Sequence, residues 1–319
     1  MDKSLLNSAR QAFHQAHKIL ITSHQRPDGD AIGSILGLGL ALQNIGKDVQ
    51  MVMADGVPSS LRHLTGSDQI KKNPEGDFDI TVVLDASDLG RIGDFLDRGK
   101  IPDLNIDHHI TNLNFAKINI IDPSAAATTE ILWDYMHDFG LSVTQPIAEA
   151  LLTGLITDTI GFRTSNVTSR TLRIAADLVD VGCDLSYLYQ EALLNRPFNA
   201  ARYWGAGLTS LKMENRLVWA ELTLESRKSV GYPGRDDADL INVLSTIKDA
   251  DISLIFIEQK NRTVKVSWRA QPGFDVSEIA AYFGGGGHKA AAGAEIPGNL
   301  ETVEAEVLKA TQKLISKCT

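Results

Sequence analysis

Short apolar runs alternate with longer amphipathic segments over roughly the first 160 residues of the chain. The runs are rich in β-branched residues and have the length of buried strands, whereas the segments that separate them have helical periodicity. This alternation is typical of a parallel sheet with crossover helices, so it predicts an α/β fold. We expect strands at residues 19–22, 49–53, 80–84 and 103–106. We expect helices at residues 30–44, 126–139 and 145–157.

Acidic and imidazole side chains follow three of the expected strands. His24 follows the first and Asp85 the third, and Asp107, His108 and His109 follow the fourth. Because ligands of parallel sheets bind outside the carboxyl ends of the strands, the pattern predicts a functional site at this edge.

The second half of the chain begins with helices and ends with a different mixture of elements. The pattern predicts two lobes, with a helical connector between an N-terminal parallel-sheet domain and a smaller C-terminal α/β domain. We expect helices at residues 170–181, 185–194, 199–212, 277–282 and 300–316, and strands at 217–220, 252–257 and 264–268. The predicted domains are 1–185 and 205–319, joined by the connector 186–204.

The charge balance limits the partners. The 319 residues include 31 Lys plus Arg and 40 Asp plus Glu, which gives a formal net charge of −9. Such a chain has no broad basic face for long duplex nucleic acid, so a phosphate must be bound locally by a metal ion, a helix N-terminus or a few cations. Cys183 and Cys318 are too few for a disulfide framework and indicate a reducing compartment. The chain shows neither a signal peptide nor an apolar run near ~18 residues, so we expect a cytoplasmic protein without a membrane partner.

The acidic residues at the predicted sheet edge indicate metal binding. Pro27 and Gly29 impose an irregular turn that lets neighbouring side chains converge. Two carboxylates ~4 Å apart repel by about 4 kcal/mol at an effective dielectric constant near 20, and divalent cations remove this repulsion. Mixed histidine and carboxylate ligands suit Mn²⁺, Fe²⁺ or Zn²⁺ better than Ca²⁺, and two ligand sets that share one aspartate would hold two ions ~3.5–4 Å apart. The residues concerned are His24, Asp28, Asp30, Asp85, Asp107, His108, His109 and Asp158.

A purely structural interpretation is the alternative for each residue alone. An aspartate at a strand end is commonly a turn or N-cap residue, and a lone histidine is commonly a surface or core residue. That interpretation weakens when it must explain such residues at several separate strand and helix ends.

Four ordered motifs resemble those of the DHH phosphoesterase superfamily. The tail from Trp268-Arg269 to Gly293 resembles the DHH-associated C-terminal domain, and the resemblance spans about Lys18 to Ile296. It is most similar to the stand-alone nanoRNase type, which degrades short oligoribonucleotides. Ile160 stands where relatives often have glycine, which leaves the local backbone geometry open. The motifs are His24-x-x-x-Asp28-x-Asp30, Asp85 after Val82-Val83-Leu84, Asp107-His108-His109 and Thr157-Asp158-Thr159.

The resemblance implies roles for these residues. Asp85 would bridge two Mn²⁺ ions, with Mg²⁺ or Co²⁺ as substitutes, and would be catalytic. Asp107 would accept a hydrogen bond from an imidazole and orient it, and His109 would stabilise charge on the scissile phosphate. The resemblance gives one ion to His24, Asp28 and Asp85, and the other to Asp30, Asp85, His108 and Asp158.

Substrate-binding residues are expected in the C-terminal lobe. A glycine run is by itself a flexible loop, but this one precedes His288 and Lys289, so its N–H groups could cradle a phosphate. Arg269 offers a bidentate fork to phosphate oxygens, and Arg163 is a further candidate. The residues expected to bind substrate are Arg163, Arg269, Gly285, Gly286, Gly287 and His288.

The resemblance implies a Mn²⁺-dependent phosphoesterase that hydrolyses short oligoribonucleotides to 5′-mononucleotides, and 3′-phosphoadenosine 5′-phosphate to AMP as a further activity. One alternative is a phosphodiesterase for cyclic or linear dinucleotides such as c-di-AMP and pApA. Another is a non-catalytic nucleotide-binding regulatory module, which the intact ligand set argues against. A connector-helix homodimer is common in such architectures, and the sequence leaves the oligomeric state open.

Overall fold

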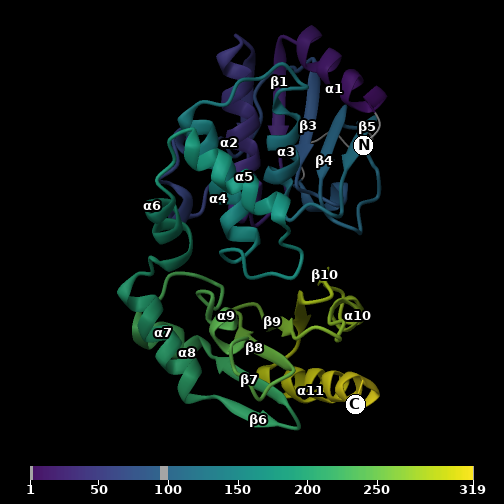
Figure 1. The fold of residues 1–319 in the computed structure, drawn as a ribbon. Helices are drawn as coiled ribbons and strands as arrows, with labels where there is room; N and C mark the ends of the chain where they lie inside the picture. The colour runs from purple at the N-terminus through teal and green to yellow at the C-terminus, as the bar shows by residue number, and fades with distance from the viewer. Residues whose placement is uncertain (1–2, 94–99, 319) are drawn as a thin grey trace. The chain divides into compact units, whose positions relative to one another are not determined.

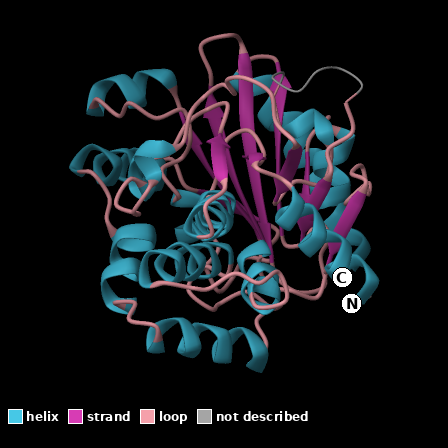
Figure 2. Cartoon of the chain, turned by 90° about the horizontal axis from the view of Figure 1, so that it is seen from above, coloured by secondary structure: helices cyan, strands magenta, loops and turns pink. Residues whose placement is uncertain are grey.

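The computed structural model describes residues 3–93 and 100–318. The chain divides into two units, Met1–Asn195 and Arg196–Thr319. Both units contain strands and helices, and the strands of each unit form one sheet. This confirms the predicted α/β fold with a parallel sheet in the first unit (Figures 1 and 2). No helix in the described ranges combines the length and the apolar character needed to cross a membrane.

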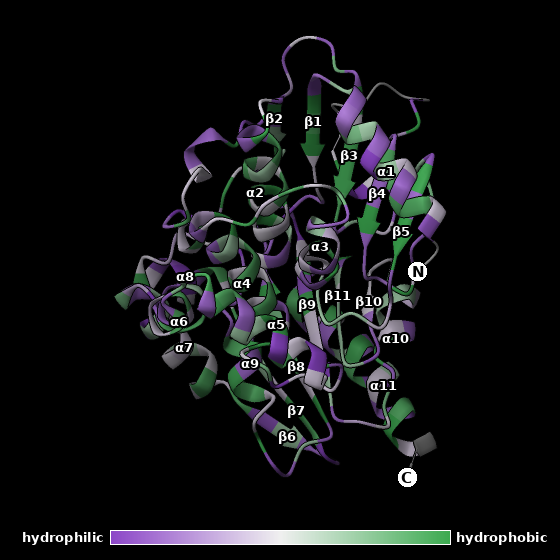
Figure 3. Ribbon diagram, turned by 45° about the horizontal axis from the view of Figure 1, so that its top comes forward, coloured by the Kyte–Doolittle hydropathy of each residue, from purple (hydrophilic) through white to green (hydrophobic). Residues whose placement is uncertain are grey.

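Five parallel strands form the sheet of the N-terminal unit, in the order β2-β1-β3-β4-β5. Neighbouring residues along the central strands are buried on both faces, as Val82 and Val83 are in β3. Such strands are nearly continuous apolar runs, and Figure 3 shows β1, β3 and β5 as mainly hydrophobic. The strands are β1 (Lys18–Thr22), β2 (Asp48–Val52), β3 (Ile80–Leu84), β4 (Leu104–Asp107) and β5 (Ile118–Ile121).

Helices α2, α3 and α4 pack against one another beside this sheet (Figure 1). Gly33 of α2 allows close packing on α4, because a Cβ atom there would lie 2.4 Å from the carbonyl oxygen of Ala150. The helices of this unit are α1 (Lys3–Gln15), α2 (Gly29–Asn44), α3 (Thr128–Met136), α4 (Gln145–Asp158), α5 (Ser169–Asp180) and α6 (Leu185–Tyr189), followed by a π-helical turn, η4 (Gln190–Leu194). The short 3₁₀ turns are η1 (Ser59–Leu61), η2 (Ser67–Gln69) and η3 (Leu89–Arg91).

The strand order places a topological switch point between β1 and β3, because the chain runs from β1 outward to β2 and then returns to the other side of β1. In doubly wound sheets the ligand site lies outside the carboxyl ends of the strands at this point. The segments after β1 and β3 carry His24 and Asp85, so the fold brings these two residues together.

A six-stranded mixed sheet forms the C-terminal unit, in the order β10-β11-β9-β8-β7-β6. Helix α11 contributes Val303 and Val307 to the core on one face, and the other face packs against Tyr203 of α7 and Leu240 of α9. The strands are β6 (Lys212–Glu214), β7 (Leu217–Leu222), β8 (Ile252–Glu258), β9 (Thr263–Ala270), β10 (Gly286–His288) and β11 (Ala291–Pro297). The helices are α7 (Phe198–Thr209), α8 (Leu224–Val230), α9 (Leu240–Leu244), α10 (Ser277–Tyr282) and α11 (Leu300–Cys318).

Several elements correct the sequence-based expectations. Strands β5 and β11 were not expected, and the glycine run, expected as a loop, forms β10. The helix expected at 199–212 ends at Thr209, because the following residues pair as β6 with the antiparallel strand β7. Strands β7 and β8 are parallel, and the crossover between them contains the unexpected helices α8 and α9.

Candidate metal centre

The turn between β1 and α2 supplies two of the predicted ligands, His24 and Asp28, and the first turn of α2 supplies a third, Asp30. Asp28 is the N-cap of α2, and its Oδ1 atom accepts hydrogen bonds from the backbone N–H groups of Asp30 (3.1 Å) and Ala31 (3.0 Å). The Nδ1 atom of His24 lies 2.8 Å from the carbonyl oxygen of Gln25. A proton on Nδ1 would be donated to that carbonyl, which leaves Nε2 free to act as a ligand.

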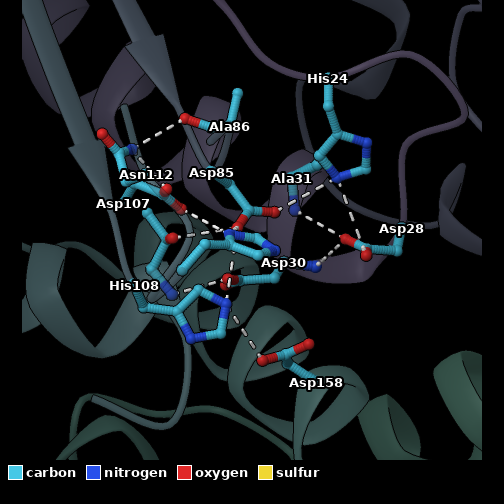
Figure 4. A network of polar contacts seen from close by, with 12 residues as sticks. His24, Asp28, Asp30, Ala31, Asp85, Ala86, Asp107, His108, Asn112 and Asp158 are labelled. Carbon is cyan, nitrogen blue, oxygen red and sulfur yellow. Dashed lines mark hydrogen bonds and ion pairs between the residues drawn. The ribbon is translucent and has the colours of Figure 1, made fainter. Parts of the chain in front are cut away.

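Asp85 lies at the centre of the predicted site (Figure 4). Its Oδ2 atom is 3.4 Å from Nε2 of His24, and its Oδ1 atom is 3.7 Å from Nε2 of His108 and 3.7 Å from Nδ1 of His109. The hydroxyl of Thr128 donates to Oδ1 at 3.1 Å. The two oxygens of this carboxylate therefore face different histidines, as a ligand shared by two ions requires.

The backbone of Asp85 is in the left-handed region, with φ 51°. A non-glycine residue held there costs on the order of 1 kcal/mol, and such strain is often found at functional sites. Here the conformation ends β3 and is fixed by a hydrogen bond from the Asp85 N–H to the carbonyl of Ile106, 2.9 Å away.

A second group of donors comes from α2, from the residue that follows β4, and from α4. Asp30, His108 and Asp158 each offer a donor atom within 4.8 Å of the others. The Nε2 atom of His108 lies 3.5 Å from Oδ2 of Asp158. The six residues predicted as metal ligands thus form two neighbouring groups, one with His24, Asp28 and Asp85 and one with Asp30, His108 and Asp158.

The separations between donors fit shared metal ions. The nitrogen–oxygen pairs around Asp85 and Asp158 are 3.4–3.7 Å apart, which is too long for a strong hydrogen bond. Donors at ~2.1 Å from one ion lie roughly 3–3.4 Å from each other, so a small contraction would suffice for coordination. The donor set of imidazoles and carboxylates also suits a divalent transition metal.

Burial and mutual repulsion perturb the protonation of this cluster strongly. Burial raises the pKa of Asp30 to about 7, with a further contribution from Asp85, and it raises that of Asp158 well above its ordinary value. Burial opposes ionisation of Asp85 as well, but His24, His109 and His108 outweigh it and hold the pKa of Asp85 low. Burial lowers the pKa of His24, but Asp28 and Asp85 raise it to about 11. Bound protons thus offset the negative charge of the carboxylates, and divalent cations would offset it in their place.

The N-terminus of α3 holds the carboxylate of Asp30. The backbone N–H groups of Thr128 and Thr129 donate to it at 2.6 and 3.0 Å, and the Thr129 hydroxyl donates at 2.8 Å. These two threonines were not among the residues expected at the site. The signal was weak, since paired threonines before Glu130 indicate only the start of a helix.

Removing the Thr129 hydroxyl is expected to weaken metal binding. In Thr129→Val, Asp30 loses one of its three donors, and the affinity for the ion held by Asp30, His108 and Asp158 should fall ~10-fold or more. Titration calorimetry with Mn²⁺ measures this change. Thr153→Val is the matched control, because the Thr153 hydroxyl is equally buried and has no hydrogen-bond partner within the described part of the chain. Equal affinities for the two variants would contradict the assigned role of Thr129.

Asp107 and His109 form a hydrogen-bonded pair beside the ligands. The Nδ1–H of His109 donates to Oδ1 of Asp107 at 2.6 Å, and Asp107 is fully buried. Burial lowers the pKa of His109, but Asp107 and Asp85 more than offset this effect, so the pKa is raised. Asp107 thus accepts a hydrogen bond from an imidazole, and the role of His109 at the phosphate stays a prediction.

The loop after α4 contains Ile160, which stands where relatives often have glycine. Ile160, Gly161 and Phe162 all have positive φ angles, of 49°, 69° and 65°. A β-branched residue in this region is an outlier, and glycine would adopt it without strain. Arg163, which follows, has an exposed side chain, and its role in substrate binding stays a prediction.

Arg269 and His288 share one row of the C-terminal sheet. Arg269 of β9 and His288 of β10 are both paired with Ala291 of β11, which lies between them. Arg269 donates from Nη1 to the carbonyl of Trp268 at 3.0 Å, whereas its buried Nε atom has no hydrogen-bond partner in residues 3–93 and 100–318. Burial lowers the pKa of Arg269, so an anion would compensate for its lost hydration.

Close strand packing requires two glycines of the run, Gly285 just before β10 and Gly287 within it. A Cβ atom on Gly285 would lie 2.1 Å from the carbonyl oxygen of Gly293, and one on Gly287 would lie 2.5 Å from that of Ala291. Gly287 also has φ 144°. The segment is exposed, as expected for a phosphate site, but it is an ordered strand and not a flexible loop.

Comparison with known proteins identifies families and relatives. Residues 18–155 match the model of the DHH family, N-terminal domain, and residues 230–317 match that of the DHHA1 domain. A Thermus thermophilus protein named bifunctional oligoribonuclease and PAP phosphatase NrnA is 35% identical over 306 residues, which cover 94% of this chain and 90% of the relative.

A solved structure extends the similarity to the whole fold. An exopolyphosphatase-related protein from Bacteroides fragilis matches with a TM-score of 0.88 and 27% identity, covering 99% of this chain and 96% of that chain. A more distant relative, a probable manganese-dependent inorganic pyrophosphatase from Lactobacillus johnsonii, is 23% identical over 176 residues, covering 51% of this chain and 55% of that protein.

Proposed function

The chain belongs to the DHH family, and we propose that it is a dinuclear metal-dependent phosphodiesterase that hydrolyses short oligoribonucleotides to 5′-mononucleotides. The observation that carries the proposal is the convergence of two donor groups around the buried carboxylate of Asp85. The name of the Thermus relative supports the substrate class and adds 3′-phosphoadenosine 5′-phosphate as a second substrate.

The ligands divide as the donor groups do. His24, Asp28 and Asp85 would hold one ion, and Asp30, Asp85, His108 and Asp158 would hold the other. Bound ions of this kind supply activation of water and neutralisation of phosphoryl charge. We propose Mn²⁺ at both positions, with Mg²⁺ or Co²⁺ as substitutes, because the donors are mixed and a relative is named as manganese-dependent.

The surrounding residues have separate tasks. Asp107 holds the imidazole of His109 in one orientation, and the raised pKa of His109 keeps it protonated. A protonated His109 would stabilise negative charge that develops on the scissile phosphate. Asp30 is held by α3, so the position of this ligand is set before an ion binds.

We assign substrate binding to Arg269, His288, the glycines Gly285, Gly286 and Gly287 at β10, and Arg163. Arg269 and His288 lie in one row of the sheet, and the residue between them, Ala291, has a small side chain. The guanidinium of Arg269 and the imidazole of His288 would donate hydrogen bonds to a phosphate of the substrate.

Loss of Arg269 is expected to weaken substrate binding without affecting the metal ions. Arg269→Ala should raise the KM for an RNA dinucleotide ~10- to 100-fold, which corresponds to ~1.4–2.7 kcal/mol of charge-assisted hydrogen bonding. Steady-state kinetics and metal analysis measure both quantities. Arg262→Ala is the control, because Arg262 is an exposed arginine at the β8–β9 turn of the same unit. If both variants keep the wild-type KM, Arg269 does not bind substrate.

The acidic chain is expected to select short substrates. Besides the metal ions, only a few cationic groups are assigned to phosphate, and each contact adds about one unit to the dependence of log K on log salt. The slope should therefore be ~−1 to −2, and dimers should be cleaved much faster than strands of about 20 nucleotides. Binding and rate measurements on labelled RNA from 2 to 20 nucleotides test this; a steep slope together with a preference for long strands would contradict it.

Product analysis tests the proposed function as a whole. Mn²⁺-loaded protein is incubated with RNA dinucleotides, 3′-phosphoadenosine 5′-phosphate and cyclic dinucleotides. We expect 5′-mononucleotides from the first and AMP from the second; exclusive cleavage of cyclic dinucleotides would favour a signalling phosphodiesterase, and no cleavage would favour a binding module. The homodimer stays a prediction, which analytical ultracentrifugation tests.

A further inference from the structure

Two asparagines, Asn112 and Asn105, belong to the hydrogen-bond network around the Asp107–His109 pair, and neither is assigned as a metal ligand. The side-chain nitrogen of Asn112 donates to Oδ2 of Asp107 at 2.6 Å, while Oδ1 of the same carboxylate accepts from His109 at 2.6 Å. Each oxygen of Asp107 therefore has a different partner (Figure 4). A carboxylate held on one side by an amide has little freedom to rotate, so the hydrogen bond from Asn112 restricts the orientation of His109.

Asn112 is itself held in place. Its side-chain nitrogen also lies 2.8 Å from Oδ1 of Asn105, which is fully buried in β4, and 3.1 Å from the carbonyl of Ala86. The side-chain oxygen of Asn112 accepts from the N–H of Asn114 at 2.7 Å, which fixes the amide with its nitrogen toward Asp107.

The same amides reach the backbone beside Asp85. The side chain of Asn105 donates to the carbonyls of Val83 (3.2 Å) and Ala86 (3.3 Å), which flank the left-handed turn of Asp85. The two asparagines thus connect the end of β3 with the end of β4. This connection fixes Asp85 and His109 relative to one another, although the two residues belong to different strands.

We infer that Asn112 is a positioning residue that acts on the reaction through Asp107 and His109, with Asn105 as its support. The inference rests on the proposed function, since His109 has its task only in phosphodiester hydrolysis. Asn112 touches neither donor group directly, so its removal should leave metal binding intact. It should lower kcat and leave KM nearly unchanged, because the effect falls on the transition state.

Kinetics of matched variants test the inference. Asn112→Ala should lower kcat for an RNA dinucleotide ~10- to 100-fold with two ions still bound. Asn112→Asp keeps the size but turns an oxygen toward Asp107, so it should be at least as impaired. Asn119→Ala is the control, because among the described residues the Asn119 side chain bonds only to the backbone of Ala116, so the variant should leave kcat unchanged.

The double variant separates positioning from general destabilisation. If Asn112 acts through His109, then Asn112→Ala should cost little in a protein that already carries His109→Ala. A second readout is independent of activity: in metal-free, ¹⁵N-labelled protein, the His109 Nδ1–H should give a downfield proton signal that disappears in Asn112→Ala and persists in Asn119→Ala.

Different outcomes would overturn the inference about Asn112 and the proposed function. An active wild type in which Asn112→Ala and Asn112→Asp match Asn119→Ala in kcat would overturn the inference, as would fully additive losses in the double variant. A wild type without hydrolytic activity would instead overturn the proposed function, and the proton signal would still report whether Asn112 orients His109.

Discussion

Asp85→Asn is expected to abolish nearly all turnover, with a fall in kcat on the order of 10³-fold or more, equivalent to ~4 kcal/mol of transition-state stabilisation. Asp85 faces His24 with one oxygen and His108 with the other, so a neutral amide removes a charged ligand from both donor groups at once. Metal content should fall below two ions per chain, because the remaining ligands cannot share a site.

Steady-state kinetics and elemental analysis measure both effects. Asp79→Asn is the control, since Asp79 directly precedes the other end of β3, and its carboxylate accepts hydrogen bonds from the backbone N–H groups of His17 and Lys18. An Asp85→Asn protein that retains two ions and half of the turnover would show that the site is not dinuclear around Asp85.

The second large effect is expected for His109→Ala, which should lower kcat by ~10²- to 10³-fold while metal content stays intact. His109 is bonded to Asp107 and is assigned to the developing charge on phosphate, not to an ion. His109→Asn should be similarly slow, because its amide can donate to Asp107 but carries no positive charge.

Metal analysis distinguishes this role from coordination. His109 also belongs to a possible donor group with Asp85 and His108. Loss of an ion in His109→Ala would show that His109 is a metal ligand. The imidazole ligand of that ion could then no longer be assigned to His108 alone.

Strand-end positions made the sheet edge of the N-terminal unit predictable from sequence. Buried parallel strands are continuous apolar runs, and polar residues follow their carboxyl ends. Because these ends lie at one edge of the sheet, the polar residues lie close together there. Strand β5 was missed because Asn119 interrupts a four-residue run, and β11 because its alanines and glycine lack the bulk typical of strands. Both become strands through pairing with neighbouring strands, β5 with β4, and β11 with β9 and β10.

Residue types explain which parts of the site were predictable. Aspartates and histidines in ordered motifs indicate ligands by their chemistry alone. Thr128, Thr129, Asn105 and Asn112 are ordinary polar residues, and their roles depend on the placement of α3 beside α2 and of β4 beside β3. The glycine run indicated a phosphate loop, but Gly285 and Gly287 are required by the close approach of β11.

Titration of Mn²⁺ into metal-free protein in the presence of an RNA dinucleotide tests the central claim most directly, with bound metal and released product followed together. The account predicts two ions bound per chain, and release of 5′-mononucleotides that reaches its full rate only when both are bound. Full turnover without a divalent ion, or an intact dinucleotide with two ions bound, would contradict it.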